Sequence, residues 1–220
     1  MCRPVSLMLF RMEQPKLPRM GFVLAGGKSS RMGTDKAFLE FGGQTLLDRA
    51  LAVVGTVCSS AAIVGDSAKF AKYGSGKYGP VVADIFPGCG PLAGIHAALA
   101  RSSAELNLML AVDMPFVSPE LLTFLFEVAE EDDAIITVPR VGQGLQPLCA
   151  VYRPAFCATA EQALRAGNYK VDAAFSGVSI RVIDESELAT AGFSERFFLN
   201  VNTPQDRLAA EGIDFDTPPG

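Results

Sequence analysis

Short apolar runs alternate along most of the chain with segments whose apolar positions recur at helical spacing. Most of the short runs end at a glycine, an aspartate or a proline, which is typical of buried strands in a parallel sheet. Strands that alternate with helices indicate an α/β protein. The pattern predicts strands over Gly21–Ala25, Ala61–Val64, Val81–Ala83, Leu106–Val112, Ala134–Val138, Leu148–Tyr152, Val178–Ile183 and Phe197–Val201.

Helices are predicted between these strands. Ser118 suits the N-cap of one helix and Pro119 its first position, while Gly167 follows the end of another. The order of elements predicts a three-layer α/β/α sandwich with a mostly parallel, Rossmann-like sheet. We expect a single domain over residues 19–215, preceded by a disordered leader over residues 1–18. The predicted helices cover Leu46–Val54, Leu92–Ala100, Leu121–Ala129 and Pro154–Ala166, and a last one opens at Thr203.

Composition and charge exclude several function classes. The net charge of −5 argues against nucleic-acid binding, which needs clustered positive charge. The apolar runs are shorter than the roughly 18 residues of a membrane span, so no membrane association is expected. Five cysteines without a C-x-x-C pair, and His96 as the single histidine, argue against a zinc site and favour reduced thiols in a cytoplasmic protein. We expect His96 to be a packed or surface residue.

The most informative segment is a glycine-rich loop after the first predicted strand, Leu24-Ala-Gly-Gly-Lys-Ser-Ser-Arg-Met-Gly-Thr-Asp-Lys36. Its glycines allow the backbone to approach a phosphate closely, with consecutive N–H groups directed at oxygen. Lys28, Arg31 and Lys36 add positive charge. The loop matches neither G-x-x-x-x-G-K-[ST] nor G-x-G-x-x-G. It therefore predicts a nucleotide phosphate site of another class.

Polar side chains follow other predicted strands. Asp84 precedes a loop rich in glycine and proline, and Asp113 follows a strongly apolar strand. Because ligands of α/β sheets bind beyond the carboxyl ends of the strands, both aspartates are expected to face the glycine-rich loop. A carboxylate there suits Mg²⁺, which prefers hard oxygen ligands and substrate phosphates. Alternation along the last predicted strand would put Asn200 and Asn202 on one face, where their amide oxygens would support the metal or the phosphates.

These residues resemble the MobA-like nucleotidyltransferases, whose signature L-A-G-G-x-S-x-R-M-G-x-D-K is filled at every fixed position. A G-P-L-x-G stretch after Asp84 and an N-V-N-T-P segment near the end extend the resemblance from Gly21 to Asp206. The resemblance implies a Mg²⁺-dependent enzyme that transfers GMP from GTP to molybdopterin-bound molybdenum and releases pyrophosphate. GTP, the molybdopterin cofactor and Mg²⁺ are the expected ligands. Whether proteins that deliver or receive the cofactor also bind is left open.

The resemblance also assigns residue roles. Arg31, Lys36 and Asp113 would be catalytic, with Asp113 as the metal ligand. The acceptor would lie near Gln146 and Lys170, and relatives often carry arginine in place of Lys170, so bidentate phosphate recognition would be lost here. The nucleotide would contact Leu24, Ala25, Gly26, Gly27, Lys36, Asp84, Gly90 and Asp113.

Other functions of the same core stay open. A CTP-dependent molybdopterin cytidylyltransferase or a sugar-phosphate nucleotidyltransferase would share these motifs, although such enzymes usually carry A-A-G where this chain has Ala25-Gly-Gly. A noncatalytic nucleotide-binding module would not need both Lys36 and Asp113. The residues do not fix the base, because guanine contacts are expected to come partly from backbone groups.

Overall fold

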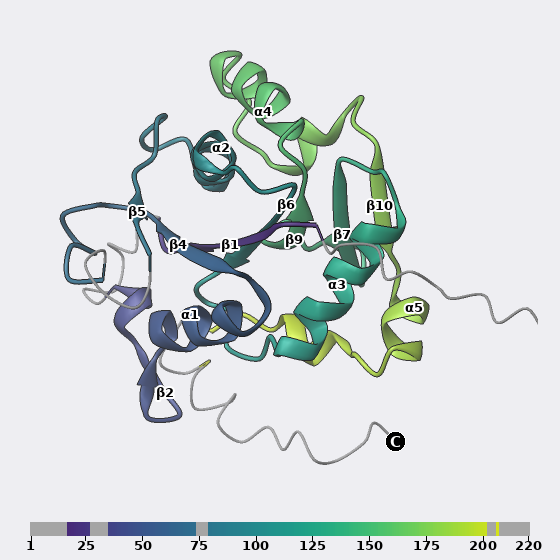
Figure 1. Cartoon of the computed structure of the whole chain (residues 1–220), viewed down its shortest axis with the longest axis horizontal. Coiled ribbons are helices and arrows are strands. Elements are labelled where there is room, and N and C mark those ends of the chain that lie inside the picture. Colours follow the sequence, from purple (N-terminus) through teal and green to yellow (C-terminus); the bar gives the residue numbers. More distant parts are fainter. Residues whose placement is uncertain (1–16, 27–34, 74–78, 202–205, 207–220) are drawn as a thin grey trace, which may run out of the picture.

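A computed structural model describes residues 17–26, 35–73, 79–201 and 206, and its centre is one twisted sheet (Figure 1). The strand order is β10-β7-β9-β6-β1-β4-β5, with β8 paired to β7. All pairs along this order are parallel except those of β9, which runs antiparallel to both β6 and β7. The strands are β1 (Arg19–Leu24), β4 (Ser60–Val64), β5 (Val81–Val82), β6 (Leu106–Ala111), β7 (Ile136–Val141), β8 (Gly144–Leu145), β9 (Cys149–Tyr152) and β10 (Ile180–Ile183), and β2 (Glu40–Phe41) and β3 (Gln44–Thr45) form a separate hairpin.

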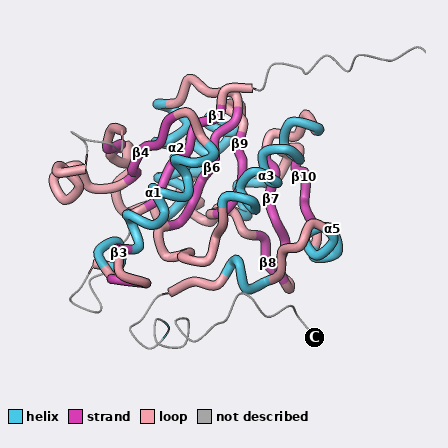
Figure 2. The backbone as a smooth tube through the Cα atoms, turned by 60° about the horizontal axis from the view of Figure 1, so that its bottom comes forward, coloured by secondary structure: helices cyan, strands magenta, loops and turns pink. Residues whose placement is uncertain are grey.

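Helices cover both faces of the sheet. α2 and α4 lie against each other on one face, and α1 and α3 lie side by side on the other (Figures 1 and 2). This arrangement confirms the predicted three-layer sandwich with a mostly parallel sheet. The helices are α1 (Leu46–Val57), α2 (Pro91–Arg101), α3 (Pro119–Glu131), α4 (Phe156–Arg165) and α5 (Glu185–Thr190), with short 3-10 helices η2 (Lys36–Phe38), η3 (Asp172–Phe175) and η4 (Glu195–Phe198).

The two faces of the sheet build separate cores. Phe22 and Leu24 of β1 pack into the cluster beneath α2 and α4, whereas Val23 between them packs into the cluster beneath α1 and α3. Side chains of a strand alternate between faces, so both faces of β1 are apolar because both are covered. Every residue of β6 is buried for the same reason.

The predicted signals at helix ends are confirmed. The Ser118 hydroxyl oxygen accepts a hydrogen bond from the backbone N–H of Leu121 at 3.3 Å, and Pro119 is the first residue of α3. Gly167, just beyond α4, has a φ of +76°, which a residue with a side chain rarely adopts. Local signals therefore set the limits of these helices correctly.

The strand predicted over Phe197–Val201 is wrong. The chain forms η4 up to Phe198, and the backbone N–H of Val201 donates a hydrogen bond of 2.8 Å to the carbonyl oxygen of Asp113. Phe193 packs its ring against Phe197, with ring centroids 5.4 Å apart. The apolar run thus packs Phe198 and Val201 into the core beneath α1 and α3 instead of extending the sheet. The helix predicted to open at Thr203 and the leader up to residue 16 lie outside the described residues.

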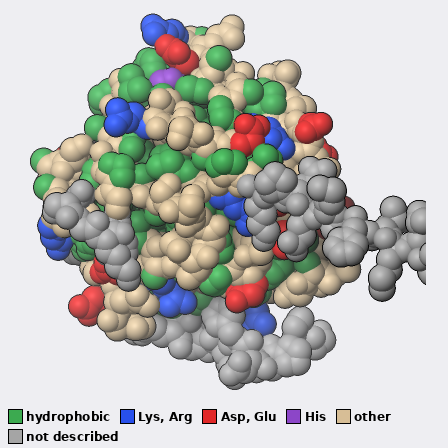
Figure 3. All heavy atoms as spheres, in the orientation of Figure 1, with side chains coloured by type: hydrophobic (Ala, Val, Ile, Leu, Met, Phe, Trp, Pro, Cys, Tyr) green, Lys and Arg blue, Asp and Glu red, His purple; other side chains and the backbone are tan. Residues whose placement is uncertain are grey.

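Among the described residues, no helix has the length and apolar character needed to cross a membrane. On the face of the molecule shown in Figure 3, side chains of both charges are interspersed among apolar and neutral ones.

The approach of α1 to β1 generates a stability prediction. A Cβ atom added at Gly21 would lie 2.1 Å from Cγ1 of Val54, so Gly21→Ala should cost about 1–3 kcal/mol in the free energy of unfolding. Gly55 of α1 faces open space, and Gly55→Ala should instead stabilise by about 0.5–1 kcal/mol. Urea denaturation measures both. Adding Val54→Ala to Gly21→Ala should relieve the clash, and a Gly21→Ala variant as stable as the parent would contradict the close packing.

Candidate active site

A cavity of about 530 Å³ opens at the carboxyl ends of the parallel strands. It lies where β1 and β6 end side by side and where the loop before α2 crosses the edge of the sheet. This is the position at which α/β sheets bind ligands. Its lining comprises Leu24, Ala25, Gly26, Asp35, Lys36, Val64, Asp84, Gly88, Gly90, Pro91, Gly94, Ala111, Val112, Asp113 and Leu148.

The cavity brings together most of the residues that the sequence singled out for nucleotide binding. Leu24, Ala25, Gly26, Lys36, Asp84, Gly90 and Asp113 all line it. Gly27, Arg31 and Asn202 lie outside the described residues. The described residues on either side of 27–34 and the two strand-end aspartates therefore share one space, as their positions after parallel strands predicted.

Lys36 is held by a short helix at the cavity wall. Asp35 caps η2, since its Oδ1 accepts a hydrogen bond from the N–H of Ala37 at 3.1 Å. From η2 the Lys36 ammonium reaches Oδ2 of Asp113 at 3.5 Å, and both side chains are partly exposed. An ion pair this long and this accessible is weak. Incoming phosphate oxygens can therefore compete for the lysine.

Asp113 sits on a loop that is fixed from two sides. Its carbonyl oxygen accepts the N–H of Val201, and the guanidinium Nε of Arg49 on α1 donates to the carbonyl oxygen of Pro115. Asn200 is exposed and directly precedes Val201. The hydrogen bond from Val201 to Asp113 therefore brings Asn200 near Asp113, although the expected strand does not form. The carboxylate thus projects from a backbone with defined geometry.

Asp84 begins the second loop of the cavity. Gly88 and Gly90 of this loop have φ values of +79° and +74°, so glycine is required at both turns. Gly90 is the N-cap residue of α2, which directs the amino end of that helix at the cavity. Burial raises the pKa of the Asp84 carboxyl above its ordinary value. In the described part of the chain no donor lies within hydrogen-bond distance of this carboxylate.

The residues predicted for the acceptor lie at the edge of this arrangement. Neither Gln146 nor Lys170 lines the cavity, although Leu148 does. Gln146 is fixed through its backbone, whose N–H donates to the carbonyl oxygen of Pro139 at 2.8 Å. Lys170 is exposed and follows Tyr169, whose carbonyl oxygen lies 4.0 Å from the place of a Cβ on Gly90. The Lys170 segment therefore borders the glycine-rich second loop.

Two residues at the site were assigned no role from the sequence, although Asp35 is a fixed position of the glycine-rich signature. Asp35 lines the cavity and forms an ion pair with Lys69, which comes from the turn after β4. Asp35 could have been suspected from its place beside Lys36, whereas Lys69 lies in a segment without a motif. His96 is 4% exposed and packs edge-on against Phe86 with ring centroids 5.3 Å apart, which confirms that it is a packed residue.

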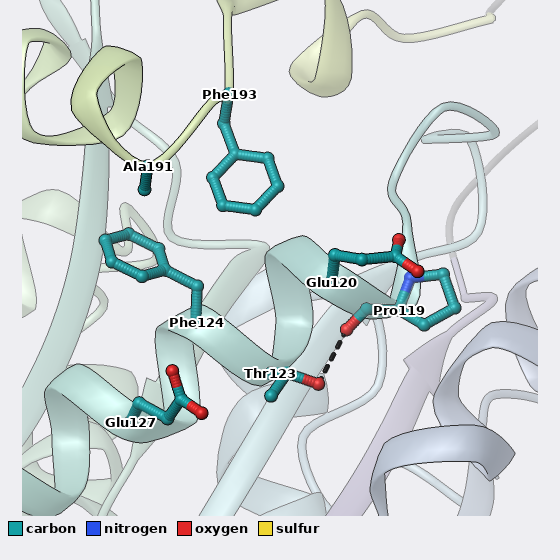
Figure 4. A pocket seen from close by; sticks show the side chains of 7 residues that line it. All are labelled: Pro119, Glu120, Thr123, Phe124, Glu127, Ala191 and Phe193. Carbon is teal, nitrogen blue, oxygen red and sulfur yellow. Dashed lines mark hydrogen bonds between the residues drawn. The ribbon is translucent and has the colours of Figure 1, made fainter.

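A second hollow of about 370 Å³ lies on the outer surface of α3 (Figure 4). Phe124 and Phe193 form its apolar wall with ring centroids 5.6 Å apart, and the hydroxyl of Thr123 donates to the carbonyl oxygen of Pro119. Its charged lining residues are the two glutamates Glu120 and Glu127. This hollow holds no group suited to binding phosphate, so the strand-end cavity is the candidate active site.

The fold and the cavity define an α/β protein with a ligand site at the strand ends, and comparison with known proteins specifies its class. The family described as "MobA-like NTP transferase domain" matches residues 21–178. The chain belongs to this family of nucleotidyltransferases.

Named relatives resemble almost the whole chain. A "Probable molybdenum cofactor guanylyltransferase" of Pelotomaculum thermopropionicum is 39% identical over 88% of this chain and 92% of its own length. A "Molybdenum cofactor guanylyltransferase" of Desulfosudis oleivorans is 32% identical over 87% of this chain and 93% of its own. The crystal structure of "Molybdopterin-guanine dinucleotide biosynthesis protein A" from Archaeoglobus fulgidus aligns with a TM-score of 0.76 and 27% identity, over 88% of this chain and 96% of that chain.

The raised pKa of Asp84 generates a prediction on stability. The folded-state pKa lies above the unfolded one, so the ionised carboxylate destabilises the folded chain. This penalty is absent below the unfolded pKa of about 3.9 and grows as the pH rises through the folded pKa. Asp84→Asn should therefore unfold at higher urea concentration than the parent at pH 7, and the difference should shrink towards pH 4.

The exposed Asp133 provides a matched control, since Asp133→Asn changes the same side chain at a distance from the cavity. A gain for Asp84→Asn that is the same at both pH values, or a loss at pH 7, would argue against the burial of a charged carboxylate at this position.

Proposed function

We propose that this chain transfers GMP from GTP to the molybdopterin-bound molybdenum cofactor and releases pyrophosphate. The observation that carries the proposal is the single cavity in which the backbone of Leu24 to Gly26, the ammonium of Lys36 and the carboxylate of Asp113 meet. Relatives with the printed name molybdenum cofactor guanylyltransferase align with nearly the full length of the chain. GTP and molybdopterin are the substrates that this name implies.

The nucleotide would enter along the ends of β1 and β6. The backbone of Gly26 would be available to it because glycine adds no side chain between the backbone and the ligand, whereas the N–H of Ala25 already donates to the carbonyl oxygen of Val64 at 2.9 Å. Lys36 would bind the triphosphate, and Arg31 would add a second cation from the glycine-rich loop. The amino end of α2, at Gly90, adds a favourable partial positive charge on the other wall.

The residues of the cavity fit a magnesium ion. Mg²⁺ is commonly held by one or two carboxylates together with substrate phosphates. Three aspartates line the cavity, namely Asp35, Asp84 and Asp113. Asp35 is paired with Lys69, so Asp84 and Asp113 are the candidate ligands. No cluster of three acidic, histidine or cysteine side chains suited to a metal occurs in the described ranges, so the triphosphate itself would supply further ligands. When bound, the ion would neutralise negative charge on the phosphates.

The transfer itself needs positioning more than covalent help from the protein. A phosphate oxygen of the acceptor would form a bond to the α-phosphorus of GTP, the bond from that phosphorus to the bridging oxygen would break, and pyrophosphate would leave. Lys36 and Asp113 would keep the reacting groups in line within a cavity partly shielded from water. The acceptor would approach from the side of Leu148 and Lys170, next to the loop that carries Gly90.

Asp113→Ala should abolish transfer, because it removes the carboxylate proposed to hold Mg²⁺ and the ion pair of that carboxylate with Lys36. The assay follows label from α-phosphate-labelled GTP into the acceptor, and we expect a loss of at least about 10³-fold in kcat/KM, the order seen when a group acting on transition-state charge is removed. Asp133→Ala, an exposed aspartate away from the cavity, is the control and should transfer normally. Transfer by Asp113→Ala at the parental rate in Mg²⁺ would rule out the metal assignment.

A further inference from the structure

Lys69 does not line the cavity, but it forms an ion pair with Asp35, which does. Its ammonium forms an ion pair with Oδ2 of Asp35, while Oδ1 of Asp35 caps η2 at the N–H of Ala37. The Lys69 and Asp35 side chains are only 23% and 28% exposed. Both oxygens of Asp35 are thus engaged, one in starting the helix that carries Lys36 and the other with Lys69.

The same ammonium also lies against the other end of η2. It sits 4.6 Å from the ring centroid of Phe70 and 5.8 Å from that of Phe38, and the two rings are 5.8 Å apart. Phe38 is the last residue of η2. A cation held over aromatic rings gains electrostatic attraction to both, which stabilises their packing. Lys69 therefore contacts both ends of a helix only three residues long.

Lys69 is itself anchored to the sheet. Oδ1 of Asp66 accepts hydrogen bonds from the backbone N–H groups of Ala68 and Lys69, at 2.8 and 3.3 Å, in the turn that follows β4. This turn also buries Phe70 completely. The turn and the buried ring of Phe70 thus fix the position of Lys69, and the contacts of Lys69 with Asp35 and Phe38 in turn restrain η2.

We propose that Lys69 is a positioning residue for nucleotide binding, which holds Asp35 and Phe38 so that η2 keeps Lys36 directed at Asp113. It has a second effect through charge, because it neutralises Asp35 inside a cavity that has to accept a triphosphate. The inference deepens the proposed function and rests on it for the identity of the nucleotide.

Lys72 is a matched control for this proposal. Its ammonium lies 5.4 Å from the ring centroid of Phe38 and 5.3 Å from that of Tyr73. Within the described ranges, however, it forms no ion pair with Asp35. Lys72→Met therefore removes a cation from the same aromatic cluster and leaves Asp35 paired, whereas Lys69→Met removes both contacts.

The first measurement is hydrogen exchange of the ligand-free protein over residues 35–39. Lys69→Met should speed the exchange of the Ala37 and Leu39 amides, whose hydrogen bonds start and close η2, while Lys72→Met and Lys69→Arg should exchange like the parent. Lys69→Gln replaces Lys69→Met if the latter does not fold. Equal exchange in the Lys69 and Lys72 variants would overturn the positioning role whether or not a nucleotide binds.

The second measurement is the dissociation constant of Mg²⁺-GTP by calorimetry. Lys69→Met should bind roughly tenfold more weakly, the order expected from one uncompensated charge near a phosphate site, and Lys69→Arg and Lys72→Met should bind nearly as the parent does. Adding Asp35→Asn to Lys69→Met should recover part of the affinity, because the uncompensated charge is gone. Parental affinity in Lys69→Met would overturn the proposal, whereas failure of the parent itself to bind GTP would count against the proposed function alone.

Discussion

The parallel pairing of β1 with β6 is the constraint on which the site depends. Leu24 is in register with Ala111, and the N–H of Val112 donates to the carbonyl oxygen of Leu24 at 3.2 Å. Because both strands run in the same direction, the glycine-rich loop and Asp113 leave the sheet at neighbouring points. A shift of this register would separate the backbone proposed to bind phosphate from the carboxylate. The apolar side chains of both strands, buried in two cores, hold that register in place.

Around this constraint the cavity is built from partly buried charges that are balanced in pairs. Lys36 faces Asp113 and Lys69 faces Asp35, while Asp84 stays without a described donor and has a raised pKa. Phosphates would compete at the pair of Lys36 with Asp113, and the pair of Lys69 with Asp35 holds the helix that carries Lys36. The two pairs thereby lower the negative charge that a triphosphate would meet, whereas the carboxylate of Asp84 has no described partner. The chemistry proposed for the site needs this balance more than it needs any single reactive group.

Much of the fold and of the site could be predicted because the relevant signals are local. Short apolar runs that end in glycine or aspartate mark the strand ends, and Leu24, Asp84 and Asp113 occupy such ends. The strand expected around Phe197 failed because an apolar pattern alone does not distinguish a strand from a short helix whose rings pack on a neighbour. The backbone there instead makes the local bonds of η4, from Phe197 to Ser194 and from Leu199 to Arg196, and the bond from Val201 to Asp113.

Other features could not be predicted because they depend on tertiary contacts. The pairing of Lys69 with Asp35 joins two turns that only the fold brings together. Gln146 and Lys170 were chosen by resemblance, and neither lines the cavity. Their roles, like those of Arg31 and Gly27, remain predictions.

The cavity at the ends of β1 and β6 is proposed to bind GTP, and competitive titration with Mg²⁺ and the four nucleoside triphosphates tests this proposal. We expect GTP to bind more tightly than CTP, ATP and UTP, and its binding to protect Lys36 from amine-reactive labelling. Tighter binding of CTP, or binding of GTP that leaves Lys36 fully reactive, would contradict it.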